Sequence, residues 1–131
     1  MKLDKENLVV DEFTSVNPVT CQFDDSLQEV KRIMRENGIR HLPVCHKQVL
    51  VGLVSERSLH ALNEEQLHYL KAKDVMATEI LTAYRNTLLR DVVYEMSDKK
   101  IGSALITDRD NKLYGVFTST DALNTIIELL A

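Results

Sequence analysis

A duplicated pattern constrains the fold of this 131-residue chain more than any other feature. When the sequence is shifted by 62 positions, Thr20 aligns with Thr82, and the apolar residues that follow align as well. Further along, "GLVSERS" from Gly52 aligns with "GVFTSTD" from Gly115, a shift of 63 that gives the second copy one extra residue. The sequence therefore predicts two copies of one structural unit.

Each copy shows the same order of elements. The extended segments "PVTC" and "ILTA" come first, and apolar residues at helical spacing follow in 26–38 and 87–100. Gly38 is a typical helix stop, and two apolar strands and a second helix complete each copy. The fold class is therefore α+β, built from tandem β-α-β-β-α repeats. A repeat of about 50 residues cannot bury enough apolar surface alone, so we expect pseudo-twofold packing into one module with two equivalent clefts.

The expected boundaries follow from this alignment. Residues 1–62 form the first repeat with an N-terminal segment, 63–74 a charged linker that is helical at most in part, and 75–131 the second repeat. The net charge of −4 argues against a nucleic-acid partner. The N-terminus lacks the apolar core of a signal peptide, and no apolar run approaches the roughly 20 residues of a membrane helix. Two cysteines outside any CxxC spacing favour a reducing, cytoplasmic location.

Four stretches together resemble a known family. The "HLPV" strand, the "KDVM" lead-in and the "GLVSERS" and "GVFTSTD" endings are similar to a cystathionine-β-synthase (CBS) domain pair, or Bateman module, over roughly residues 11–130. The resemblance implies no catalysis by this module. It implies a free-standing regulatory module that binds an adenine nucleotide (AMP, ADP or ATP) in an inter-repeat cleft. S-adenosylmethionine and NAD remain alternative ligands. We also expect a homodimer and a regulated partner protein.

The second "GVFTSTD" loop carries the chemistry of a nucleotide site. The first amides of a helix starting near Ser119 attract an anion, and the Thr118 hydroxyl can bind a phosphate. Asp121 is an acceptor-only carboxylate suited to ribose hydroxyls, and Gly115 permits close backbone approach. The alternative is structural, because Thr118 and Asp121 also have the spacing of a helix capping box.

The resemblance also implies that the loop of one copy faces the early strands of the other. Asp121 is then expected opposite Thr20, Cys21, Arg40 and His41, with Arg40 supplying a charge-assisted bond to phosphate. The alternative is that Arg40 and His41 are ordinary solvent-facing strand residues.

The other cleft is expected to be weaker. Ser58 stands where the second copy has Asp121, and a short neutral side chain cannot hold a diol as a carboxylate does. Arg57 could attract a phosphate there, although a solvated surface residue is the competing interpretation. The residues expected at this cleft are Thr82, Gly102, Ser103, Ser55, Arg57 and Ser58.

Other interpretations are less favoured. Cys21, His41, Cys45 and His46 suggest zinc, but alternate strand residues face opposite sides. Neither cysteine has an orienting carboxylate nearby, which disfavours an enzyme. The apolar end of the last helix, at Ile126-Ile127 and Leu129-Leu130, is expected to cover a partner subunit. The alternative function is therefore a non-catalytic dimerisation or interaction module with vestigial clefts.

Overall fold

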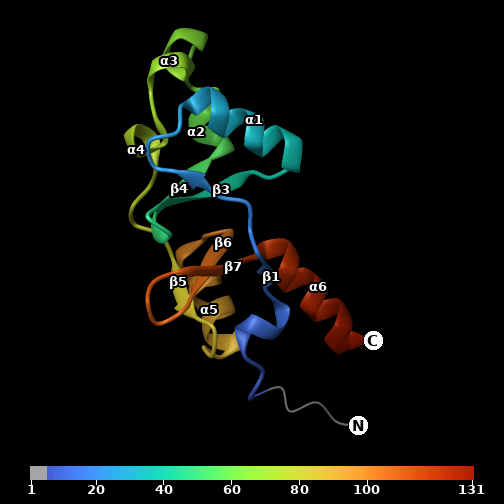
Figure 1. Cartoon of the computed structure of the whole chain (residues 1–131). Coiled ribbons are helices and arrows are strands. Elements are labelled where there is room, and N and C mark those ends of the chain that lie inside the picture. The colour runs from blue at the N-terminus through green and yellow to red at the C-terminus, as the bar shows by residue number, and fades with distance from the viewer. Residues whose placement is uncertain (1–5) are drawn as a thin grey trace. The chain divides into compact units, whose positions relative to one another are not determined.

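The computed structural model describes residues 6–131, which form two compact units (Figure 1). The first-repeat unit comprises residues 19–80, and the second-repeat unit comprises residues 6–18 together with 81–131. Each unit combines its own sheet with its own helices, so the predicted α+β class is confirmed.

The first-repeat unit contains a three-stranded sheet of order β2-β3-β4. Strand β2 (Cys21–Gln22) pairs parallel with β3 (His41–His46), which pairs antiparallel with β4 (Val49–Ser55). Its helices are α1 (Leu27–Asn37), α2 (Glu56–His60), α3 (Glu64–Tyr69) and α4 (Ala72–Val75). The parallel β2–β3 pair is connected through α1, as a parallel connection requires a crossover.

The second-repeat unit contains a four-stranded sheet of order β1-β7-β6-β5. Its strands are β1 (Ser15–Val16), β5 (Thr82–Tyr84), β6 (Ser103–Thr107) and β7 (Leu113–Thr118). Its helices are the short 3-10 helix η1 (Val10–Phe13) and the α-helices α5 (Leu89–Lys99) and α6 (Ser119–Leu130). The predicted order of strand, helix, strand, strand and helix is confirmed in both repeats.

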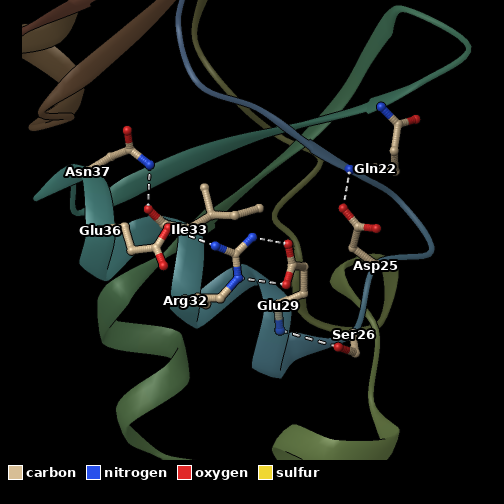
Figure 2. Close-up of polar contacts among 8 residues, drawn as sticks. All are labelled: Gln22, Asp25, Ser26, Glu29, Arg32, Ile33, Glu36 and Asn37. Atoms are coloured by element: carbon tan, nitrogen blue, oxygen red, sulfur yellow. Dashed lines mark hydrogen bonds and ion pairs between the residues drawn. The ribbon is translucent and has the colours of Figure 1, made fainter.

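Local sequence explains where α1 begins and ends. The Ser26 hydroxyl accepts a hydrogen bond from the Glu29 amide at 3.2 Å, and Gly38 ends the helix with φ of 60°. Arg32 donates from Nε to Glu29 at 2.9 Å and from a terminal nitrogen to Glu36 at 2.7 Å (Figure 2). These exposed pairs contribute only about 0.2–0.5 kcal/mol each, so the caps and the apolar face define the helix.

The apolar faces of the two long helices form the cores, as their spacing predicted. The buried positions are Leu27, Val30 and Met34 of α1, and Leu89, Val92 and Met96 of α5. The α1 residues pack with Leu42, Val44 and Val54 from the sheet of the first-repeat unit. The α5 residues pack with Val10, Ala104, Ile106 and Phe117 of the second-repeat unit.

Residues 63–74 are structured rather than a plain linker. The Asn63 side chain and Gln66 form a reciprocal capping box that starts α3. Leu67 is buried and Ala72 has no exposed surface, and both belong to the core of the first-repeat unit. The range assigned to a charged linker therefore contributes two short helices to the first repeat.

Residues 6–18 of the N-terminal segment, which was expected to belong to the first repeat, pack within the second-repeat unit. Strand β1 pairs antiparallel with β7, where Ser15 lies opposite Val116, and helix η1 contributes Val10 to the core (Figure 1). The first-repeat unit has a matching feature, because Leu53 of β4 exchanges backbone hydrogen bonds of 3.0 and 2.8 Å with Ala77. In each unit, the segment that precedes the other repeat therefore covers the edge of the last strand.

These crossings explain the glycine in each repeated motif. A Cβ atom at Gly115 would lie 2.4 Å from the backbone oxygen of Ser15, and one at Gly52 would lie 2.6 Å from the sulfur of Met76. The close approach expected at Gly115 is thus made by the chain's own backbone.

Candidate functional site

The "GVFTSTD" loop joins β7 to α6 and is held by a capping box. The Thr118 hydroxyl accepts from the Asp121 amide at 3.2 Å. The Asp121 Oδ2 accepts from the Thr118 amide at 2.8 Å and from its hydroxyl at 3.0 Å. The structural interpretation of the Thr118–Asp121 spacing is therefore confirmed, with aspartate in the place that Glu or Gln usually occupies.

The cap uses only one of the two Asp121 oxygens. Its Oδ1 is approached at 3.5 Å by the Ser15 hydroxyl, which is too long for a strong hydrogen bond. Asp121 is partly exposed, and a carboxylate has about four acceptor positions. Capping and ligand binding are therefore compatible at this residue.

The helix amides offer less to an anion than the sequence suggested. The Ser119 amide donates to the Gly102 carbonyl at 3.0 Å, and the Asp121 amide donates to the Thr118 hydroxyl. Within residues 6–131, Thr120 alone among the first three residues of α6 has an amide without a hydrogen-bond partner. The start of α6 is consequently a weak anion site on its own.

Several expected residues of the second-repeat unit lie together. Ser103 pairs with Thr118 across β6 and β7, and Gly102 accepts hydrogen bonds from the amide and hydroxyl of Ser119. Thr82 lies elsewhere, because β5 pairs with β6 at Leu105 and is separated from β7 by β6.

The first-repeat unit presents a comparable loop without the carboxylate. The Ser55 hydroxyl caps α2 by accepting from the Ser58 amide at 3.3 Å, and the two hydroxyls are 2.9 Å apart. His41 pairs with Ser55, and the Arg40 carbonyl accepts from the Glu56 amide at 2.8 Å. Arg40 and His41 therefore stand at the same end of the sheet as the Ser55 loop of their own repeat.

Arg57 is exposed and makes no ion pair within residues 6–131. Arg40 is also exposed. Partial desolvation lowers the pKa of His41 below its ordinary value of 6.5, and the charge of Arg40 lowers it further. The loop end of the first-repeat unit thus holds two exposed guanidinium groups and an imidazole that favours its neutral form.

Cys21 differs from the expectation for a ligand-contacting side chain. It belongs to the core of the first-repeat unit with 2% of its surface exposed. Burial raises the pKa of Cys21 to about 12, with smaller contributions from Asp25 and Cys45. Any ligand contact at Cys21 would involve its backbone, whereas Thr20 beside it is partly exposed.

The remaining chemistry is limited. Burial raises the pKa of the Cys45 thiol, and the His46 ring packs edge-on against Phe23 with centroids 4.1 Å apart. Residues 6–131 contain no group of three or more His, Cys, Asp or Glu side chains placed to hold a metal ion. In the same residues, no helix combines the length and hydropathy needed to cross a membrane.

The expected residues divide between the two units. Thr20, Cys21, Arg40, His41, Ser55, Arg57 and Ser58 belong to the first-repeat unit. Thr82, Gly102, Ser103, Thr118, Ser119 and Asp121 belong to the second-repeat unit. The expectation that Asp121 faces the early strands of the first repeat is therefore a hypothesis about the assembled module. Sequence reasoning missed Ser15, because nothing in the loop motif indicates that the N-terminal segment lies beside Asp121.

Two tandem β-α-β-β-α units, each ending in a strand–loop–helix with a hydroxyl cap, define a paired-repeat module. The model of the CBS domain matches residues 10–62 and 72–128, and the chain belongs to the CBS domain family. The predicted resemblance is thereby confirmed.

Relatives with the same domain are longer than this chain. The uncharacterized protein MJ1225 of Methanocaldococcus jannaschii is 25% identical over 92% of this chain and 49% of its own length. The inosine-5'-monophosphate dehydrogenase of Korarchaeum cryptofilum is 28% identical over 88% of this chain and 23% of its own. The chain thus spans about half the length, or less, of these curated relatives.

Solved structures share the fold over nearly the whole chain. A Vibrio cholerae protein provisionally assigned to acetoin utilization (AcuB) has a TM-score of 0.85 and 25% identity, covering 94% of this chain and 93% of that one. CBSX2 in complex with AMP has a TM-score of 0.86 and 22% identity, covering 95% of this chain and 99% of that one. The CBS domain of a bacterial CNNM/CorC family Mg2+ transporter in complex with ATP has a TM-score of 0.86 and 19% identity, covering 95% of this chain and 90% of that one.

Proposed function

We propose that the chain is a regulatory module that binds an adenine nucleotide in a cleft between its repeats and transmits the occupancy to a dimer or partner. The observation that carries the proposal is the Oδ1 of Asp121, which receives only a long 3.5 Å hydrogen bond from the Ser15 hydroxyl, at a position where the first repeat has Ser58. The complexes of CBSX2 with AMP and of the CNNM/CorC domain with ATP support this ligand class.

We assign a separate part of the nucleotide to each group of residues. Asp121 would accept the two ribose hydroxyls through Oδ1 while Oδ2 keeps the cap. Arg40 and His41 would bind the phosphates, because the amides of the second loop are mostly engaged and the chain carries a net charge of −4. The backbone at Thr20 and Cys21 would contact the base. The cleft of Thr82, Gly102, Ser103, Ser55, Arg57 and Ser58 would bind weakly or remain empty.

Titration calorimetry with AMP and ATP tests the site. Charged hydrogen bonds contribute about 1.5–3 kcal/mol, so Asp121→Asn should weaken binding about 10- to 100-fold. The asparagine oxygen can still accept from the Thr118 amide, so the melting temperature should change little. Ser58→Ala is the matched control in the first repeat and should bind as the wild type does. Two equal sites per chain, or wild-type affinity in a folded Asp121→Asn variant, would refute the proposed site.

The exposed face of α6 supports a homodimer. Leu123, Ile126, Ile127 and Leu130 are 61%, 49%, 65% and 80% exposed. At 100° per residue these four lie on one stripe of the helix, and Asp121 and Glu128 lie on its other side. The stripe therefore lacks charges that would oppose a second copy. Sedimentation should show a dimer that Ile127→Glu dissociates, and a wild-type monomer at micromolar concentration would refute this part of the proposal.

The same stripe also favours the alternative of an interaction module with vestigial clefts. A nucleotide-dependent rise in melting temperature separates the two functions, because only a binding module is stabilised by its ligand. We propose no catalysis by this chain, since the buried thiols have raised pKa values. Both cysteines are free, which agrees with a cytoplasmic location.

A further inference from the structure

A cavity of about 270 Å³ lies at the open edge of β5 in the second-repeat unit, beside α5. Its lining combines an apolar wall, which includes Leu81 and Val92, with the carboxylates of Asp91 and Glu95. None of the described residues that line it is Lys or Arg. All of the lining residues belong to the second-repeat unit.

The Thr107 side chain adds a polar group to the two carboxylates of this cavity. Thr107 lines the cavity, is 3% exposed, and its hydroxyl makes no hydrogen bond to any residue in 6–131. Because no fully buried side-chain oxygen in that range lacks a partner, this hydroxyl must retain some solvent access. Because Thr107 lines the cavity, the cavity is where its hydroxyl reaches solvent. The hydroxyl is therefore free to bind water or the polar group of a ligand that enters the cavity.

The acceptor set is specific to the second repeat. In the 62-residue register, Thr107 corresponds to Cys45, Asp91 to Glu29 and Glu95 to Ile33. Glu29 is bound by Arg32 (Figure 2). The side chains of Ile33 and Cys45 offer no strong acceptor. The fold of the repeat therefore does not require a hydroxyl and two carboxylates at these positions.

The cations next to the cavity are only loosely held. Arg90 lies 3.9 Å from Asp91 and Lys99 lies 3.4 Å from Glu95, and all four side chains are at least half exposed. Such surface pairs contribute about 0–1 kcal/mol, so an incoming cation can displace them.

We propose that this cavity binds a small organic cation, a primary ammonium or guanidinium on a short apolar chain. The two carboxylates would accept its charged N–H donors, the Thr107 hydroxyl would accept one more, and the Leu81 and Val92 wall would contact its carbon chain. The proposal uses no residue of the Asp121 nucleotide site, although Thr82, which was expected at the weaker cleft, also lines this cavity.

Agmatine is a suitable probe, since it carries both cationic groups on a four-carbon chain. Titration of the whole isotope-labelled chain should give saturable amide shifts in β5, in the first half of α5 and at Thr107. Asp91→Asn combined with Glu95→Gln should abolish these shifts. Thr107→Val should weaken binding about tenfold, as expected for one charge-assisted hydrogen bond. Asp98→Asn on the same helix is the matched control, because Asp98 does not line the cavity.

Uncharged 1,4-butanediol should give no saturable shifts, and binding of agmatine should weaken with added salt. Thr107→Cys, which restores the residue of the first repeat, serves if the valine variant does not fold. Equal agmatine affinity in Asp98→Asn and in the double variant would show general surface attraction and overturn the proposal. Unchanged affinity in a folded Thr107 variant would overturn it as well.

Discussion

Replacing Gly115 by alanine should destabilise the second-repeat unit by about 1–3 kcal/mol, the usual cost of forcing a methyl group into a packed site. The new Cβ would lie 2.4 Å from the backbone oxygen of Ser15 and 2.5 Å from Cγ2 of Thr14. The oxygen belongs to β1, which pairs with β7 at this point, so it cannot rotate away as a side-chain terminus can. The substitution must therefore displace β1 or break its pairing.

Gly52→Ala is the matched comparison in the other repeat. Its Cβ would meet Sδ and Cγ of Met76 at 2.6 and 2.8 Å and the backbone oxygen of Ala77 at 3.0 Å. The methionine side chain is flexible and can move, so this variant should lose less stability, about 1 kcal/mol or less. Urea unfolding followed by circular dichroism, with hydrogen exchange to assign the unit that opens, measures both.

Two outcomes would refute the reasoning. One is a Gly115→Ala variant within about 0.5 kcal/mol of the wild type, since surface-like changes fall in that range. The other is full rescue of Gly115→Ala by Thr14→Ser, which removes Cγ2 but leaves the Ser15 oxygen in place. Rescue would mean that a side chain, and not the crossing backbone, requires the glycine.

Three further predictions concern caps and titration. Lys100 ends α5 at a φ of 56°, in the left-handed region that favours glycine. Lys100→Gly should therefore raise the free energy of unfolding in urea by about 1 kcal/mol. Gly38→Ala at the equivalent end of α1 should lower it. Asp121→Ala removes two hydrogen bonds of a cap and should cost about 1 kcal/mol, whereas Ser58→Ala should cost less; equal losses would contradict the capping geometry. The pKa of His41 is lowered in the folded chain, so the unfolded chain binds more protons below pH 6.5, and the free energy of unfolding should fall as pH drops from 6.5 towards that lowered value. His41→Gln should flatten this part of the pH profile, while AMP affinity should rise over the same pH range if the imidazolium binds phosphate.

The fold was predictable because it depends on periodicities that the sequence repeats. The helical spacing from Leu27 to Met34, the stop at Gly38 and the paired apolar strands each appear in the structure. Where segments pack was less predictable. Residues 63–74 look like a charged linker because only Leu67 and Ala72 are buried, with Leu70 partly buried against the core, and these few positions give no clear period.

The residues of the candidate site stay a prediction, and their contacts could not be read from the sequence. Thr118 and Asp121 have a spacing that serves a cap and a ligand equally well. Only the structure shows that the cap engages Oδ2, while Oδ1 receives a long hydrogen bond from Ser15. Gly115 was expected to admit a ligand, but it accommodates Ser15, a residue 100 positions earlier. Local sequence carries no signal for such a long-range crossing. The cavity at Thr107 was missed for a similar reason, because its walls come from β5, α5 and β6.

A last prediction follows from the position of Asp121 at the start of α6, the helix that carries the exposed apolar stripe. A nucleotide bound at Asp121 Oδ1 and a second copy bound at Ile127 would act on opposite sides of one helix. If nucleotide changes the dimer dissociation constant by some factor, then dimerisation must change nucleotide affinity by the same factor. AMP affinity should therefore differ between wild-type dimer and the Ile127→Glu monomer, by the factor that sedimentation measures with and without AMP. A factor of about five corresponds to 1 kcal/mol of coupling and is readily measured by calorimetry. Identical AMP affinities in a proven dimer and a proven monomer would show that the cleft and the α6 stripe work independently.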